Sequence, residues 1–471
     1  MIRSLPQPYR RIWLTIAVAL LVIPAIVAAI VIFTGHGVNW WKSNKDVSFV
    51  RGTWRTPTQT LLASSMSVQP TVGWRFTLAD TGVPDPEPSA AYLFANDANP
   101  FLSDPYVGNL GDRAYFMVGN IGAPAPQWWL VAVDVNDGSR AFPPIPLVAG
   151  ESRPRCYLNG PDAVLCLADG AGPTTAWVID SQTGLVTYTG PTPLTVYSSK
   201  FIMKQVGIYA VATKQDQGVY GIGPTAQTTW FVPGNGVMSD AVRNPLDFEP
   251  PTLASQAAGR GSDRQITFSL RDGTVIRPEI AADKQQGYTE IYPGGFAAEV
   301  TAARDVGEVQ FFEESGRRAG RNGVPGELGS SPGLPLVNLT AGGWALFNAQ
   351  GQLLMQQSTP KRAHAAVIGD FLVVDGDEPT DKRQFDMTSG TEMKACSLPK
   401  GFFASDGRVA LGYDGYADTG RTLTAVDLST CDTRWTTHSP PGSFRKLWRI
   451  NTTLVQLSDD GTELMSLVAP G

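Results

Sequence analysis

The chain after residue 104 is a succession of short stretches in which apolar and polar residues alternate. Alternation with a period of two is typical of half-buried strands, and a turn rich in Gly, Asp or Asn between two such stretches is typical of a hairpin. The pattern therefore predicts eight strand–turn–strand hairpins. They cover residues 128–145, 175–190, 266–280, 309–320, 344–357, 383–398, 422–437 and 454–468.

A second pair of apolar stretches precedes most of these hairpins, for example at 105–119, 199–213 and 365–376. A unit thus holds about four strands in roughly 35–45 residues, which is typical of a β-propeller blade. We expect an all-β fold, a β-propeller of seven or eight blades, with a pair of β-sandwiches as the alternative. The count stays open because the units near 246–281 and 330–358 are short or irregular.

The two ends of the repeat region predict how the ring closes. The last unit runs out of chain after its third strand, and residues 72–80 form an apolar stretch with no hairpin partner. We expect 72–80 to be the outer strand of the last blade. Three long insertions, at 81–104, 233–262 and 314–335, break the period and are expected to be loops.

The amino-terminal region has a different pattern, with no charge from Ile12 to Thr34. At about 1.5 Å per residue, this stretch is long enough for a helix to cross a bilayer core of about 30 Å. Arg10 and Arg11 precede it, which places the short tail in the cytoplasm, and Trp40 and Trp41 suit the outer interface. A cleaved signal peptide is the alternative, but its apolar region is usually shorter, about 7–15 residues.

The predicted organisation is therefore a single-pass protein of the inner (plasma) membrane with its ring in the periplasm or cell envelope. It comprises a cytoplasmic tail (1–11), a transmembrane helix (12–34), a juxtamembrane linker (35–67) and a propeller (68–471). Beyond residue 42 the chain has 33 basic and 43 acidic residues, a net charge of −10. An acidic exported region argues against nucleic acid as a partner.

Four cysteines, Cys156, Cys166, Cys396 and Cys431, all follow the predicted span. In an oxidising compartment we expect two disulfides, with three pairings open and free buried thiols as the alternative. Cys156 and Cys166 flank a hairpin with Asn-Gly-Pro-Asp at its turn, so that they can face each other across two strands.

The sequence contains no set of residues typical of a known catalytic site. There are three histidines in all, no Gly-x-Ser-x-Gly motif and no Cys-x-x-Cys pair. We therefore expect no enzyme activity, no cofactor and no metal site. A glycan-active or quinone-active enzyme is the less favoured alternative.

Two clusters of charged residues, one in an insertion and one in a turn, are candidates for binding a partner or ligand. The first is the basic set Arg317, Arg318 and Arg321, which suits an anionic headgroup or an acidic partner. The second is an acidic turn, whose oxygens are of the kind that calcium binds. It contains Asp375, Asp377 and Glu378. A solvated loop and a solvated acidic turn are the simpler interpretations.

The repeat unit resembles the quinoprotein (PQQ-like) β-propeller family. Two segments carry the resemblance, WVIDSQTGLVTY (177–188) and AVDLSTCDTRW (425–435), in which Cys431 stands where the family has glycine. The resemblance extends over about 68–471 and implies the propeller fold, but little about activity.

The layout of basic tail, single span, tryptophan pair and ring is similar to the mycobacterial polar growth factor (PgfA-like) family. That resemblance implies a role in trehalose mycolate trafficking and cell-wall growth with an RND-type lipid transporter, and a glycolipid ligand. We therefore expect a non-enzymatic, membrane-anchored accessory or scaffold for a membrane assembly, with an inner-membrane transporter or envelope protein complex as partner. A scaffold for envelope protein assembly, resembling the outer-membrane assembly propellers, is the alternative.

Overall fold

The computed structural model describes residues 48–471, apart from 51, 85–90, 96–103, 122–125, 149–152, 171, 197–200, 240–245, 247–249, 303–306, 332, 361, 379–381, 400 and 417–418. Residues 47–471 form one compact unit, which begins ahead of the boundary expected at 68. None of the helices in the described ranges is both long and apolar enough to cross a bilayer. The predicted span at 12–34 and its anchor residues Arg10, Arg11, Trp40 and Trp41 lie outside those ranges and stay a prediction.

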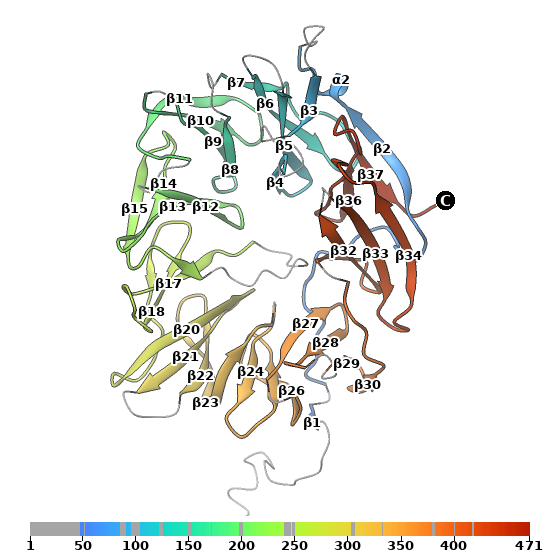
Figure 1. The fold of residues 1–471 in the computed structure, drawn as a ribbon. Helices are drawn as coiled ribbons and strands as arrows, with labels where there is room; N and C mark the ends of the chain where they lie inside the picture. Colours follow the sequence, from blue (N-terminus) through green and yellow to red (C-terminus); the bar gives the residue numbers. More distant parts are fainter. Residues whose placement is uncertain are drawn as a thin grey trace, which may run out of the picture. The chain divides into compact units, whose positions relative to one another are not determined.

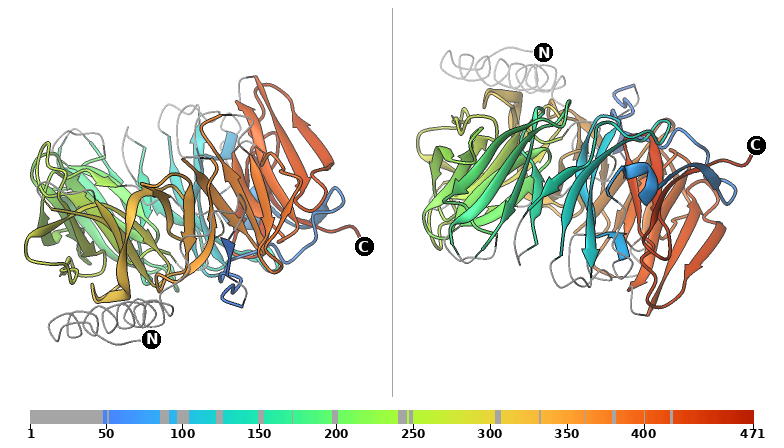
Figure 2. Two further views of the ribbon diagram at one scale, coloured as in Figure 1. Left: turned by 90° about the horizontal axis from the view of Figure 1, so that it is seen from below. Right: turned by 90° about the horizontal axis from the view of Figure 1, so that it is seen from above.

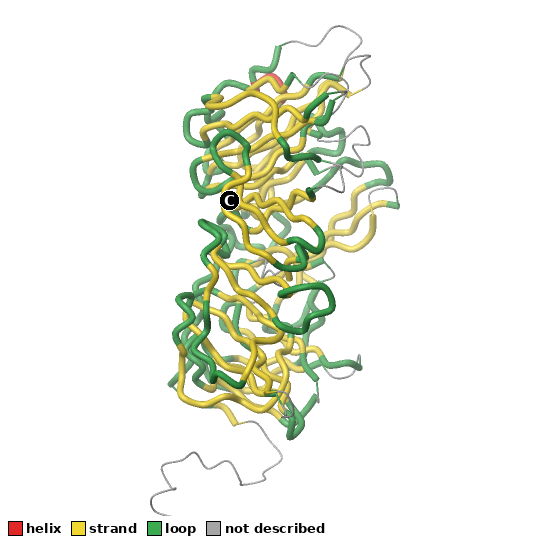
Figure 3. The backbone as a smooth tube through the Cα atoms, turned by 90° about the vertical axis from the view of Figure 1, so that its left-hand side faces the viewer, coloured by secondary structure: helices red, strands yellow, loops and turns green. Residues whose placement is uncertain are grey.

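Strands make up nearly all of the regular structure (Figure 3). Within the described residues the strands form eight sheets, one of which has eight strands and divides in two at β23. The result is nine four-stranded blades, which follow one another in chain order (Figures 1 and 2).

Each blade runs from an inner strand, next to the middle of the ring, to an outer strand (Figure 1). Blade 1 is β4 (Tyr106–Leu110), β5 (Arg113–Ile121), β6 (Trp128–Asp134) and β7 (Ile145–Leu147), with β3 (Ala91–Phe94) also on β5; blade 2 is β8 (Arg155–Leu158), β9 (Ala163–Ala168), β10 (Thr174–Asp180) and β11 (Val186–Thr192); blade 3 is β12 (Ile202–Val206), β13 (Tyr209–Lys214), β14 (Gly218–Ile222) and β15 (Thr228–Pro233).

The middle of the chain forms the next three blades. Blade 4 is β16 (Met238–Ser239), β17 (Leu253–Ala257), β18 (Gln265–Ser269) and β19 (Val275–Ile276); blade 5 is β20 (Lys284–Tyr292), β21 (Gly295–Ala302), β22 (Glu308–Glu313) and the first part of β23 (Arg318–Gly329); blade 6 is the rest of β23 with β24 (Leu336–Leu339), β25 (Trp344–Phe347), β26 (Leu353–Gln357) and, outside it, β1 (Ser48–Phe49).

The last three blades include one strand from the start of the chain. Blade 7 is β27 (His364–Ile368), β28 (Phe371–Asp375), β29 (Arg383–Asp386) and β30 (Thr391–Met393); blade 8 is β31 (Phe402–Ser405), β32 (Val409–Tyr416), β33 (Gly420–Asp427) and β34 (Thr433–Ser439); blade 9 is β35 (Leu447–Ile450), β36 (Thr453–Leu457), β37 (Glu463–Val468) and β2 (Thr71–Thr77), which α2 (Leu78–Thr81) follows.

The expected count of seven or eight blades is therefore corrected to nine in the described part of the chain. Each of the eight predicted hairpins lies in a different blade, and the ninth blade is the one built on β12–β15. Its outer hairpin, β14–β15, was missed because residues 223–227 form its turn without an Asp-Gly or Asn-Gly signal. Ala226 takes the left-handed backbone conformation there, with φ 53°.

The predicted ring closure is confirmed. β2 pairs antiparallel with β37, with Thr71 opposite Val468 and Thr77 opposite Glu463, so the start of the ring supplies the outer strand of the last blade. Arg75 and Glu463 add an ion pair of 2.5 Å on this seam. Hydrogen bonds and side chains, with no covalent bond, join the two ends.

The prediction of a loop at 314–335 is wrong for most of that segment. Residues 318–329 are the strand β23, which pairs first with β22 and then with β24 and so serves two blades. Glycines let the strand pass close to its neighbours, since a Cβ at Gly326 would lie 2.8 Å from a methyl carbon of Val337. The glycine-rich sequence predicts a loop, but here it marks a close backbone approach.

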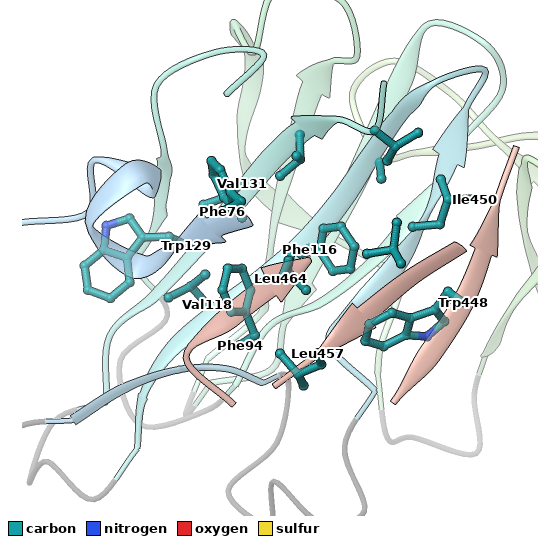
Figure 4. Close-up of a cluster of buried hydrophobic side chains, with 14 residues drawn as sticks. Phe76, Phe94, Phe116, Val118, Trp129, Val131, Trp448, Ile450, Leu457 and Leu464 are labelled. Atoms are coloured by element: carbon teal, nitrogen blue, oxygen red, sulfur yellow. The ribbon is translucent and has the colours of Figure 1, made fainter. Parts of the chain in front are cut away.

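The hydrophobic core is divided into nine clusters of buried side chains among the described residues, one between each pair of consecutive blades. The cluster between blades 9 and 1 includes Phe76, Phe116 and Trp448 (Figure 4). The Phe116 and Trp448 rings meet edge to face with centroids 5.6 Å apart. Because the last blade packs on the first in the same way as the others, the core is continuous around the ring.

An aromatic ring at the outer edge of one blade often rests on the hairpin turn of the next. Trp74 of β2 lies against Gly138, and Trp230 of β15 lies against Gly273, and a Cβ on either glycine would come 2.7 Å from the indole. Both turns have φ near 75° (75° and 73°). Phe142 on Gly184 and Phe49 on Gly390 repeat the contact.

A disulfide takes the place of this contact between blades 7 and 8. Cys431 occupies the turn position with φ 66° and is bonded to Cys396, which follows β30. The other disulfide joins Cys156 to Cys166, which are directly opposite on β8 and β9 of blade 2. The structure thus pairs all four cysteines, and one bond holds two blades together.

The segment that precedes β2, residues 52–70, is an N-terminal strap across blades 7 to 9. Trp54 donates its indole N–H to Asp370 of blade 7 at 2.9 Å. The backbone N–H of Leu62 donates to the carbonyl of Ser405 in blade 8 at 2.8 Å. The part of the expected linker from 52 to 67 therefore belongs to the ring.

We expect Gly138→Ala to destabilise the ring more than Gly261→Ala. Both glycines have a left-handed backbone (φ 75° and 68°), but the space around Gly261 is open, while a Cβ at Gly138 collides with Trp74. The additional loss should be about 1–3 kcal/mol, the usual range for overpacking. Urea unfolding of both variants measures this difference in the free energy of unfolding. Equal losses in the two variants would show that the contact between Trp74 and Gly138 does not add to stability.

Replacing Cys396 by Ala together with Cys431→Gly should remove a crosslink while leaving a residue suited to φ 66° at the turn. For a separation of 35 residues the loss in free energy of unfolding is about 4 kcal/mol. The pair Cys156→Ala and Cys166→Ala, with a separation of 10, should lose about 1 kcal/mol less from chain entropy. Thermal melting with and without reductant tests both, and a wild-type ring that melts identically in reductant contradicts the expectation.

Candidate functional site

The best candidate site is a cavity on the inner side of the ring, with a volume of about 680 Å³. Its walls come from the inner strands of blades 9, 1, 2 and 3 and from the N-terminal strap. They include Tyr106, Asn109, Leu158, Gln205, Arg449, Asn451 and Thr60. A volume within the roughly 300–1,000 Å³ of small-molecule sites suits one ligand or the end of one peptide segment.

Amide side chains fix the geometry of this central cavity. The side-chain carbonyl of Gln205 on β12 accepts the backbone N–H of Leu158 on β8 at 2.7 Å, which ties blade 3 to blade 2. The amide nitrogen of Gln205 donates to the carbonyl of Gly207 at 3.1 Å. Since both ends of the amide are satisfied, the wall is held in place before any ligand binds.

Arg449 and Asn451 form the wall from blade 9. Arg449 donates from Nη1 to the carbonyl of Asn451 at 3.0 Å. Asn451, in a left-handed turn with φ 50°, donates its amide to the carboxylate of Asp112 in blade 1. One guanidinium and several amides therefore face a site built across the seam where the ring closes.

A chain segment from the far side of the ring completes the cavity wall. Pro250 and Pro251, which precede β17 of blade 4, line it. In the same connection, Leu246 is fully buried in the cluster between blades 7 and 8, and its carbonyl accepts the N–H of Thr60 at 2.8 Å. Leu246, which lies between β16 and β17 in the chain, therefore contacts blades 7 and 8 and the N-terminal strap.

The lining of the central cavity offers mainly hydrogen-bonding groups and apolar side chains. Among the described residues that line it there is no carboxylate, histidine or cysteine. General acid–base or nucleophilic catalysis needs such groups within hydrogen-bond reach of a reacting atom. Amides, one guanidinium and backbone groups instead offer hydrogen bonds to a polar or anionic partner.

The residues singled out from the sequence do not lie in this cavity. Arg317 forms an ion pair with Glu313 (2.6 Å), and the backbone N–H of Arg318 donates to Glu279; the side chain of Arg321 is outside the described set. The three acidic candidates do not converge on one point: Asp375 is 3.7 Å from Lys382, and Asp377 and Glu378 are exposed. In the described ranges no group of three or more His, Cys, Asp or Glu side chains is placed to hold a metal ion.

Sequence reasoning missed Gln205, Arg449 and Asn451. Each comes from an inner strand or its turn, and the three belong to blades 3 and 9, which are far apart in the chain. Their one common signal is a polar residue on an otherwise apolar inner hairpin. That signal does not identify which blades contribute to the same cavity.

Glu290 is a buried carboxyl group with a strongly raised pKa. It is buried on β20, and burial raises the pKa of Glu290 from 4.5 to about 8, opposed by a hydrogen bond from the Ser331 backbone N–H (3.2 Å). Its other oxygen has no hydrogen-bond partner in the structure. Since it does not line the central cavity, we interpret it as a structural acid that binds the Ser331 backbone to blade 5.

Comparison with known proteins bears on this arrangement. The model of a family described as the conjugation-associated 9-bladed β-propeller domain matches residues 46–470. A protein of uncharacterised function from Mycolicibacterium smegmatis (strain MKD8) is 37% identical over 486 residues, covering 99% of this chain and 98% of its own length. The blade number in the family description is the number counted here.

Similarity to solved structures is lower. BamB from Moraxella catarrhalis is 12% identical, with a TM-score of 0.32 over 85% of this chain and 97% of that one. The computationally designed Ika8 protein is 13% identical, with a TM-score of 0.33 over 64% and 93% of the two chains. At these values the structures support no argument about function. The finer resemblances to quinoprotein and polar growth factor propellers stay predictions.

The raised pKa of Glu290 predicts a pH-dependent stability. Its pKa is about 8 in the folded ring against an ordinary 4.5, so the protonated acid favours folding. The stabilisation is complete below pH 4.5 and is lost as the pH rises through 8, by on the order of 5 kcal/mol. Glu290→Gln should flatten this slope in urea titrations at pH 5 and pH 9, with Glu279→Gln as an exposed control. A wild-type slope in Glu290→Gln would assign the effect to another group.

Proposed function

Because the chain belongs to the conjugation-associated 9-bladed β-propeller domains, we propose that it is a non-enzymatic scaffold for a membrane assembly in the cell envelope, most directly one that serves conjugative DNA transfer. The membrane helix predicted at 12–34 would hold the ring at the outer face of the inner membrane. Tethering would raise the local concentration of the ring for other membrane proteins.

The central cavity is the observation that carries this proposal. It is preformed and lined by amides, Arg449 and aromatic and aliphatic side chains, and its described lining has no acid–base pair. Such a surface binds without reacting. We expect its occupant to be a polar or acidic peptide segment of a partner protein, since backbone and carboxylate oxygens match the amide and guanidinium donors.

The acidic charge of the chain favours a supporting role in transfer over contact with the transferred DNA. With 37 basic and 43 acidic residues, the whole chain has a net charge of −6. DNA binding depends on a positive surface that displaces counterions. The scaffold would therefore bind the proteins of the transfer apparatus.

Lipid trafficking beside a transporter is the second candidate function. The layout of the chain motivates it, and it requires an apolar funnel. Val107, Leu110 and Ile208 supply apolar wall in the central cavity, next to Asn109 and Arg449. The mixed lining favours a peptide over an acyl chain, and we keep lipid as an explicit outcome of the experiment.

Conjugation frequency is the first test. Deleting the gene in its own host should lower plasmid transfer, wild-type protein should restore it, and Arg449→Ala should restore it at least about tenfold less well, as expected for an arginine at a binding hot spot. Arg260→Ala, at an arginine with 84% of its side chain exposed on blade 4, is the matched control. Normal transfer in the deletion strain would reject the conjugative role.

Crosslinking identifies the partner class independently. A photoreactive amino acid in place of Gln182, an exposed residue of the cavity wall, should crosslink to a membrane protein of the same assembly in intact cells. The same group in place of Arg260 should not. A crosslinked glycolipid would favour the lipid candidate, and a crosslinked glycan that is cleaved would favour an enzyme.

A further inference from the structure

A second cavity, of about 200 Å³, lies between blades 8 and 9. Its walls are the facing surfaces of β33 and β34 on one side and of β36, β37 and the residues before β35 on the other, with Val72 of β2 at its edge. Being smaller than the roughly 300–1,000 Å³ of drug-sized sites, it suits a small ligand or one terminal group of a larger one.

Three cationic side chains, Arg421, Arg445 and Lys446, line this interblade pocket. None of its described lining residues is acidic. Like charges gathered in a partly buried site repel one another, and a bound anion offsets that repulsion. The concentration of positive charge stands out in a chain with a net charge of −6.

Among the described residues, Arg421 forms no ion pair with an acidic side chain. Its Nη1 donates to the carbonyl of Arg445 at 3.3 Å, and its guanidinium lies 5.6 Å from the centre of the Tyr413 ring. The carbonyl and the ring hold the guanidinium in a fixed position. A fixed guanidinium with unused donors is well suited to bind a tetrahedral or planar oxyanion.

Arg445 also has a donor to spare. Its Nη2 forms an ion pair of 2.5 Å with Asp459, and Nη1 donates to the carbonyl of His438 at 3.3 Å. Its Nε is buried and has no hydrogen-bond partner in the structure. A buried, unpaired donor on a charged group costs free energy, and an oxygen of a bound anion is the acceptor that it lacks.

Lys446 adds a partly buried positive charge to the same wall. Burial lowers the pKa of Lys446, the charge of Asp104 raises it, and the charge of Arg421 lowers it further. Thr437 and Ser439 add hydroxyl groups to the wall, and Leu423, Leu447 and Leu467 make its apolar side.

We propose that the pocket between blades 8 and 9 binds a phosphate group, through Arg421, Arg445 and Lys446, either as inorganic phosphate or as the end of a phosphate monoester. Three donors of positive charge around a small space match the two charges and several oxygens of phosphate better than the single charge of a carboxylate. The site is separate from the central cavity and does not depend on the proposed scaffold function.

The test is calorimetric titration of the full-length protein in low-salt buffer with inorganic phosphate, glycerol 3-phosphate and acetate. We expect saturable phosphate binding that weakens as ionic strength rises, and at least tenfold weaker binding in Arg421→Gln. Arg260→Gln, an exposed arginine on blade 4, should bind as the wild type does. Tighter binding of glycerol 3-phosphate than of phosphate would assign the site to an ester, and the reverse to the free ion.

A melting curve without phosphate separates a folding defect from a binding defect. If Arg421→Gln melts early, Lys446→Met takes its place, since it removes one charge from the opposite wall. Absence of saturable phosphate binding by the wild-type protein, equal binding by Arg421→Gln and wild type, or acetate binding as tight as phosphate would each overturn the proposal.

Discussion

The ring depends on one repeated contact, in which the outer edge of a blade rests on the hairpin turn of the next. The turn residue has a left-handed backbone and little or no side chain, so a flat indole or phenyl ring can lie directly on it, as Trp74 does on Gly138 and Trp230 on Gly273. Each contact joins the outer edge of one blade to the turn of the next. Between the blades, nine clusters of buried side chains follow one another around the ring.

Departures from that contact show where the ring needs other support. At blade 8 the turn residue is Cys431, and a disulfide to Cys396 replaces the aromatic ring. At the closing seam the outer strand comes from the start of the chain, so the N-terminal strap adds hydrogen bonds to blades 7 and 8. Leu246 supports the same side of the ring from blade 4. The reinforcement is gathered on blades 7 to 9, which are the last part of the chain to be made and the part that must capture β2.

The contacts between blades also hold the binding groups of the two cavities in position. Gln205 accepts a hydrogen bond from the neighbouring blade, and Asn451 donates one across the seam to Asp112. The hydrogen bonds that shape the central cavity are therefore the ones that hold the blades together. The cationic pocket between blades 8 and 9 is likewise a gap between two packed sheets. Both proposed binding sites are formed where blades meet. Their lining residues come mainly from inner strands and interblade faces, and few come from the long loops.

The sequence by itself determined the class of fold and the manner of its closure. Period-two alternation with turn residues at regular intervals admits few architectures, and an orphan strand at 72–80 opposite an incomplete last unit predicts β2 on β37. It could not determine the blade number, because the turn at 223–227 lacks a recognisable signal and the glycines of β23 are as common in loops as in a strand of close backbone approach. Only the tertiary structure decided the sites. Arg421 and Lys446 share one pocket, and Gln205 and Arg449 another, because the fold brings them together in space. The local pattern that specifies a strand does not specify which blade lies beside it.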